Sequence, residues 1–350
     1  MRRAPLLLGL LMGSIALGPG LPAVAQEPAA SPALTRPLAE FVAEIPLGTD
    51  LASAASGVAV DGRGTLYVID APSDEIWIFG QGDLRDELSS TKRQGPVVAT
   101  RGEHGDGPGQ FQFQYPWGPP HWGDLAIGPD GNLYVMDTFN SRIQVFAPDG
   151  TYLREWGEPG SAEGQLAWPS GIGIDISGRV YVADTRNARV QIFDGEGQFL
   201  AAWGLSAAEG GTVFNPADVA VDAAGIISVT DSRANRIVRF TPEGTVLDTV
   251  GAPGLLPGQL SRPWGAAVDA GGNLYVAELG SSRVQGFSPD GTSLGTVGSF
   301  GEAPGEFRVP LFLTIGPDGL LYVADEANRR VQVFRLLAPL APTVEPPAVS

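Results

Sequence analysis

Residues 133–146 read LYVMDTFNSRIQVF, and residues 180–193 read VYVADTRNARVQIF. Each stretch holds two short apolar runs of alternating pattern, separated by a loop that starts with an acid and ends with an arginine. Alternation with a period of two predicts a pair of β-strands. The phenylalanine that closes the second run recurs every 47 residues, at Phe146, Phe193, Phe240, Phe287 and Phe334. The chain is therefore predicted to be a repeat protein.

Each repeat contains four predicted strands. In the third copy, residues 171–175 precede the pair described above and residues 199–203 follow it. Pro-Asp-Gly sequences at 129–131 and 148–150 predict tight turns, because proline presets φ and glycine tolerates positive φ. A looser first copy with Tyr67, Asp70 and Phe79 brings the number of copies to six. Four-stranded repeats of this length predict an all-β fold, a six-bladed β-propeller.

The two ends of the chain are predicted to meet. The sixth copy stops after Phe334 and lacks a fourth strand, whereas Phe41 to Ile45 resembles a fourth strand and precedes the first copy. We expect this segment to pair beside Val331 to Phe334. Such pairing closes the ring and removes two exposed sheet edges.

The repeat resembles the NHL family of propellers within the TolB-like superfamily. The resemblance rests on residues 133–146, on the near copy at 180–193, and on the loop Gly164-Gln165-Leu166 that precedes Pro169. It covers nearly the whole chain beyond Leu38 and implies a six-bladed propeller, here a secreted bacterial member. NHL-like propellers include lyases, RNA binders and protein-binding platforms, so the resemblance does not imply one activity.

The first 25 residues have the pattern of a secretory signal peptide. Arg2 and Arg3 precede an apolar stretch, and Ala23-Val24-Ala25 fits a cleavage site. Residues 26–38 and 338–350 are rich in proline and alanine and are expected to be a disordered linker and tail around a propeller at 39–337. We therefore expect a secreted or periplasmic, monomeric protein without membrane insertion, because no later apolar run approaches about 20 residues.

The composition argues against nucleic acid as a partner. The formal net charge is −17 and Lys92 is the single lysine, so the chain lacks the basic stripe that displaces counterions from phosphates. An acidic surface favours solubility and cationic ligands instead.

Strand order assigns each loop to one of two faces. We call the face with the acid-to-arginine loops and the Gly-Gln-Leu loops the top face, and the face with the Pro-Asp-Gly turns the bottom face. First strands line the central channel, so the residues that open them are expected to ring its top mouth. These residues are Gly57, Asp124, Gly171, Asp218, Gly265 and Phe312.

Acids and arginines recur around the ring in nearly every repeat. The acids are Asp70, Asp137, Asp184, Asp231, Glu278 and Asp325, and the arginines are Arg142, Arg189, Arg236, Arg283 and Arg330. Such rings suit a multivalent cation site or an anion collector. A residue repeated in every blade is better explained by a task that each blade has, so we expect acid–arginine pairs that brace the loops.

Departures from the repeat are the more informative candidates for function. The loop that enters the second blade is longer than its counterparts and holds two tryptophans and one of only two histidines. Together with acids and aromatics at the same level, it predicts an acidic and aromatic pocket for a cationic or sugar-like ligand. Alternatively, Trp117 and Trp122 plug the channel. The predicted binding residues are Trp117, His121, Trp122, Asp124, Asp218, Trp264 and Phe312.

The sequence favours a protein- or ligand-binding platform without catalysis, cofactor or metal. Two histidines, His104 and His121, are too few for the three-histidine zinc site of a peptide-amidating NHL-type lyase. A metal-dependent lactonase-like hydrolase is the alternative, since Asp124 and Asp218 are potential ligands, but no third ligand is identified. The insertion at 81–95, on the bottom face, is the competing interaction surface.

Overall fold

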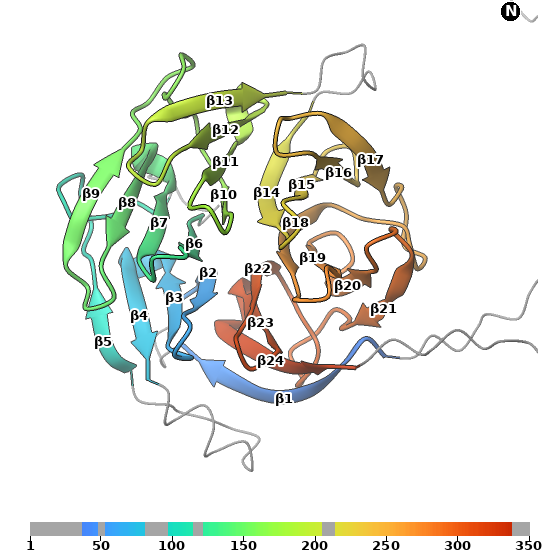
Figure 1. Cartoon of the computed structure of the whole chain (residues 1–350). Coiled ribbons are helices and arrows are strands. Elements are labelled where there is room, and N and C mark those ends of the chain that lie inside the picture. The colour runs from blue at the N-terminus through green and yellow to red at the C-terminus, as the bar shows by residue number, and fades with distance from the viewer. Residues whose placement is uncertain (1–36, 48–52, 81–96, 115–121, 205–213, 338–350) are drawn as a thin grey trace, which may run out of the picture. The chain divides into compact units, whose positions relative to one another are not determined.

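The computed structural model describes residues 37–47, 53–80, 97–114, 122–204 and 214–337. These residues form six four-stranded antiparallel sheets, arranged as blades around a central channel (Figure 1). The predicted all-β, six-bladed propeller is therefore confirmed. The blades are numbered along the chain from the first strand that lines the channel.

In blades one to five the strands run from the channel outwards in chain order, and in blade six the outermost strand is β1. The first strands are β2 (Ala55–Val60), β6 (Asp124–Ile127), β10 (Gly171–Ile174), β14 (Pro216–Val221), β18 (Pro263–Val268) and β22 (Pro310–Ile315). The second strands are β3 (Leu66–Asp70), β7 (Leu133–Asp137), β11 (Val180–Asp184), β15 (Ile227–Asp231), β19 (Leu274–Glu278) and β23 (Leu320–Asp325). The third strands are β4 (Glu75–Phe79), β8 (Arg142–Phe146), β12 (Arg189–Phe193), β16 (Arg236–Phe240), β20 (Arg283–Phe287) and β24 (Arg330–Leu336). The fourth strands are β5 (Val97–Arg101), β9 (Tyr152–Trp156), β13 (Phe199–Trp203), β17 (Val246–Val250), β21 (Ser293–Val297) and, in blade six, β1 (Ala39–Pro46).

The strand that completes blade six comes from the other end of the sequence (Figure 1). β1 pairs antiparallel with β24, and Phe41 lies opposite Phe334 while Ile45 lies opposite Val331. The predicted closure is confirmed. Leu38, at the end of the predicted linker, also belongs to the propeller, because its side chain is buried and its backbone bonds to Thr296 and Leu337.

Tight turns join the strands at the bottom face. In the turn after β6, the N–H of Gly131 donates to the carbonyl of Gly128, and Gly131 has φ of 78°, a conformation that favours glycine. The turn after β10 is held by Asp175, whose Oδ1 accepts the N–H groups of Ser177 and Arg179. Aspartate side chains in these turns therefore do local structural work.

The repeated acids and arginines brace the loops of the top face. Arg142 Nε lies 2.9 Å from Oδ2 of the buried Asp137, and its Nη2 donates to the carbonyls of Gly107 and Gln110 in the loop before the blade. The equivalent pairs are Arg189–Asp184, Arg236–Asp231, Arg283–Glu278 and Arg330–Asp325. These contacts support the structural interpretation of both rings.

Short 3₁₀ turns occupy the loops between second and third strands. They are η1 (Ala71–Ser73), η2 (Thr138–Asn140), η3 (Thr185–Asn187) and η5 (Glu326–Asn328). Within the described ranges, no helix is long and apolar enough to cross a membrane.

The hydrophobic core is divided into clusters that lie mostly between neighbouring blades. At two of these interfaces a tryptophan from the fourth strand acts as a wedge. Trp156 packs between Tyr134 of its own blade and Phe193 of the next, with ring centroids 6.2 and 6.1 Å away. Trp203 packs between Tyr181 and Phe240 in the same way. Adjacent blades are therefore joined by large aromatic contacts.

Candidate functional site

The residues that open the first strands alternate between glycine and a larger side chain. A Cβ at Gly171 would lie 2.4 Å from Oδ1 of Asp218, and one at Gly57 would lie 2.9 Å from the Cα of Asp124. A Cβ at Gly265 would lie 2.7 Å from the Cα of Phe312. At each of these three contacts, glycine lets its strand lie against the neighbouring first strand at a separation that a side chain would not allow. The larger residues, Asp124, Asp218 and Phe312, belong to blades two, four and six.

Asp124 and Asp218 meet inside this ring. Both side chains are buried and are hydrogen-bonded to each other. Asp124 also accepts the N–H groups of Leu125 and Ile172, at 2.8 and 3.1 Å. Asp218 accepts those of Val219 and Ala266, at 2.7 and 2.8 Å. Each carboxyl group therefore ties its own blade to the next one.

Burial raises the pKa of both carboxyl groups. The pKa of Asp218 is raised to about 7, chiefly by desolvation. The pKa of Asp124 is raised well above its ordinary value by desolvation and then by the charge of Asp218. Burial and the proximity of the two carboxyl groups thus both favour protonation of the pair over its doubly ionised form.

A layer of apolar side chains covers the aspartate pair at the top mouth. Trp264 and Phe312 are only 6% and 1% exposed, and Trp122 packs against the cluster that they form with Ala217 and Leu311. The ring centroids of Trp122 and Trp264 are 5.3 Å apart. Trp122 precedes β6 of blade two, and Trp264 lies in β18 of blade five. Blades two and five lie opposite each other in the ring, so the contact between the two indoles spans the channel mouth. Trp122 therefore lies where the plugging alternative expects it.

The channel below this layer is a cavity of about 320 Å³. Its wall consists of the six first strands, and Asp124 and Asp218 are among the lining residues. Toward the bottom face, the strands end in the half-buried side chains Val60, Ile127, Ile174, Val221, Val268 and Ile315.

Two aromatic residues that the sequence analysis did not single out extend the top-face layer. Phe139 stacks on Trp122 with centroids 6.4 Å apart, and Trp168 contacts Trp122 and Phe139 edge-on at 6.3 and 5.7 Å. The guanidinium of Arg186 lies 3.6 Å from the centre of the Trp168 ring. We call Trp122, Phe139 and Trp168, which are all half-buried, the aromatic patch. Phe139 departs from the repeat, since η2 carries Phe139 where η3 carries Arg186.

The structure thus brings five predicted site residues together at the top mouth: Trp122, Asp124, Asp218, Trp264 and Phe312. Trp117 and His121 lie outside the described residues. Of these five residues, Trp122 is half-exposed and the other four are buried.

Metal ligation finds little support in the described part of the chain. No group of three or more histidine, aspartate or glutamate side chains in it is arranged to hold an ion. The oxygens of Asp124 and Asp218 already accept backbone N–H bonds, and the third equivalent ring position is Phe312. His104 pairs with Asp74 at 2.7 Å in the loop between blades one and two.

Comparison with known proteins agrees with this architecture. The family model of the NHL repeat matches residues 166–193, 260–287 and 307–334. NHL repeat-containing protein 3 of Mus musculus is 30% identical over 109 residues, 31% of this chain and 26% of that protein. Peptidyl-glycine alpha-amidating monooxygenase of Mus musculus is 27% identical over 124 residues, 34% of this chain and 11% of that protein. The chain thus matches about a quarter or less of the length of these relatives.

Among solved structures, the fold is similar to that of a catalytically inactive virginiamycin B lyase from Staphylococcus aureus with quinupristin. The TM-score is 0.57 at 14% identity, covering 84% of this chain and 98% of the other. A sequence identity of 14% supports similarity of fold and nothing further. The chain therefore contains NHL repeats, is similar over part of its length to NHL repeat-containing proteins, and folds as a six-bladed β-propeller.

Proposed function

We propose that this propeller is a binding platform without catalysis, and that its top face binds a partner through the aromatic patch. The observation that carries the proposal is the gathering of Trp122, Phe139 and Trp168 on one face from two blades and the loops between them. Half-exposed tryptophans in such clusters are common anchors of protein interfaces.

The partner is a protein or peptide that presents a cationic side chain. Arg186 stacked on Trp168 is an internal example of the cation–π contact that such a side chain would make with the patch. The formal charge of −17 would speed the approach of a basic segment over longer distances. The aspartate pair is buried and is not required for this contact.

Peptide selection on the immobilised protein tests the proposal. We expect the selected peptides to be enriched in arginine or lysine and to bind Trp168→Ala at least tenfold more weakly, a loss of about 1.4 kcal/mol. Phe300→Ala is the matched control, because Phe300 is 71% exposed on another top-face loop. Selected peptides that bind wild type and Trp168→Ala equally, or that lose binding only when residues 83–93 are deleted, would place the interaction elsewhere.

We also propose that the protein acts outside the cytoplasm. The basic, apolar and small-residue segments within residues 1–25 support export. Amino-terminal sequencing of the purified native protein is expected to begin at Gln26. A mature protein that retains Arg2 and Arg3 would contradict export by this route.

A further inference from the structure

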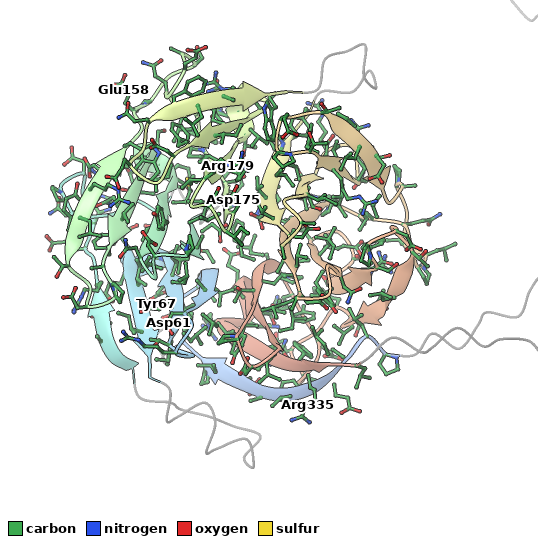
Figure 2. The ribbon with its side chains drawn as sticks, viewed as in Figure 1. Asp61, Tyr67, Glu158, Asp175, Arg179 and Arg335 are labelled. Carbon is green, nitrogen blue, oxygen red and sulfur yellow. The ribbon has the colours of Figure 1, made fainter. Side chains whose placement is uncertain are left out.

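A second cavity lies on the bottom face, between blades one and two. Its volume is about 220 Å³. Its walls include Tyr67 and Ile76 of blade one and Phe146 of blade two, all buried. Figure 2 shows Tyr67 beside Asp61, which belongs to the turn at the edge of the cavity. The cavity is thus an apolar slot that the aromatic patch, on the other face, does not contact.

The slot exists because blade one lacks the tryptophan wedge. Arg101 lies opposite Ile76 in the same register that places Trp156 opposite Ile143 and Trp203 opposite Val190. Arg101, Trp156 and Trp203 also lie against equivalent turns of the next blade. For Arg101 the turn is the one that contains Gly150, where an added Cβ would lie 2.6 Å from Nε of Arg101. At Gly197 and Gly244 the nearest atoms belong instead to the indoles of Trp156 and Trp203.

A second replacement enlarges the slot. Ala99 lies opposite Ile78, whereas the equivalent residue of blade two is Arg154, opposite Val145. Arg154 donates to the carbonyl of Gly195 and the hydroxyl of Tyr134, so its side chain spans the blade interface. Alanine leaves this space open between Tyr67 and the turn of blade two.

The mouth of the slot is charged. Arg63 and Arg101 are exposed there, together with Asp149. Asp61 accepts the N–H groups of Arg63 and Thr65, and Asp149 accepts that of Thr151, so both carboxylates serve their own turns. The two guanidinium groups are the charges better suited to an incoming anion.

We propose that the slot between blades one and two is a binding site for a flat aromatic molecule of one or two fused rings that carries an acidic group. Its ring lies between Tyr67 and Phe146, which are the counterparts of the two aromatic residues that flank an indole at each of the next two interfaces. The volume suffices, because an apolar cavity of about 150 Å³ accepts benzene. The acidic group lies at the mouth, beside Arg63 and Arg101.

Calorimetric titration with indole-3-acetate tests the site. Wild type is expected to bind one molecule per chain with Kd of about 1 mM or tighter, and Arg101→Trp, which supplies the missing wedge, is expected to abolish binding. Arg101→Trp should also melt no lower than wild type, since it fills a cavity. The matched control is Arg335→Trp, the same change at an exposed position of β24 (Figure 2), and it should bind as wild type does.

Two further variants distinguish the contribution of the ligand's aromatic ring from that of its acidic group. Arg101→Gln is expected to weaken indole-3-acetate about tenfold while leaving the binding of uncharged indole unchanged. Ala99→Arg introduces the residue that blade two carries at the equivalent position, Arg154, and should also close the slot and abolish binding. It serves as the test if Arg101→Trp does not fold. Absence of saturable binding to wild type, or binding that survives in a folded Arg101→Trp or Ala99→Arg protein, would overturn the proposal.

Discussion

At the scale of single residues, the unusual feature is a pair of buried carboxyl groups, Asp124 and Asp218. Burying one ionised carboxylate costs several kcal/mol, and burying two side by side costs more. Asp124 and Asp218 offset this cost by accepting four backbone N–H bonds, and their raised pKa values favour protonation. Their contact requires Gly171, where a side chain would collide with Asp218.

The aspartate pair should make stability depend on pH. An acid whose pKa is raised on folding binds its proton more tightly in the folded state, so it stabilises the fold at low pH. This contribution is lost as pH rises from about 4, the unfolded pKa, to about 7. We expect the free energy of unfolding of the wild-type protein to decrease between pH 4 and about 7 because of this pair. In Asp124→Asn the decrease should be smaller.

Urea unfolding at intervals between pH 4 and 8 measures the difference. Glu163→Gln, which alters an exposed acid, serves as control and should keep the wild-type profile. A profile for Asp124→Asn that parallels wild type throughout would show that the pair does not take up the proton.

Chelation should leave thermal stability unchanged. All four carboxylate oxygens of the pair have backbone donors, and Phe312 occupies the position of a third ligand. Two carboxylates alone make a poor divalent site. Melting with and without EDTA is expected to give equal midpoints. A drop of several degrees that disappears in Asp124→Asn and Asp218→Asn would instead support the hydrolase alternative.

At the scale of elements, the wedge on the fourth strand determines how tightly two blades join. Trp156 and Trp203 fill their interfaces, whereas blade four carries Val250 and leaves a small cavity of about 30 Å³ beside it. Blade one carries Arg101 and leaves the larger slot. In these four blades, side chains of the outermost strand therefore affect how completely the interface with the next blade is filled.

Trp203→Ala should destabilise the protein by roughly 3 kcal/mol, the lower end for removing a packed tryptophan, because this residue is only half-buried. Its indole lies between Tyr181 and Phe240 and over Gly244. Chemical denaturation of the variant measures the loss. Leu200→Ala, on the same strand and 50% exposed, should change stability little. Equal effects of the two substitutions would contradict the wedge.

At the scale of the whole molecule, stability depends on closing the ring. β1 supplies the outer strand of blade six, and Arg330 binds both Asp325 of its own blade and Glu44 of β1. Ile45 and Ala43 are buried with Val331 and Val333. Without β1 the edge of β24 and this cluster would be exposed to water.

Deletion of residues 26–48 should therefore lower the melting temperature sharply. Deletion of residues 26–36 alone, which spares β1 and Leu38, is the control and should melt as wild type does. Calorimetry on both proteins makes the comparison. An unchanged melt after the longer deletion would show that the β1–β24 pairing contributes little.

The sequence by itself determined the repeat, the four strands of each blade, the blade number and the closing strand. These features are local or periodic: alternation predicts strands, proline and glycine predict turns, and an interval of 47 residues reports identical packing in successive copies. The loop-bracing role of the recurring acids and arginines followed from the same periodicity. Departures from it also pointed to Trp122, Asp124 and Asp218 as residues that meet at the top mouth.

The tertiary structure alone decided which departures touch and which spaces stay empty. Trp122 and Trp264 are far apart in sequence and meet only because the closed ring turns blades two and five toward each other. The slot at Arg101 became visible only from strand register, since the first copy is interrupted by an insertion that hides its alignment. The repeat in the sequence determines the contacts within each blade, such as its strands, turns and loop-bracing pairs. Contacts across the channel and cavities between blades depend on the sum of side-chain volumes at interfaces, which no single repeat contains.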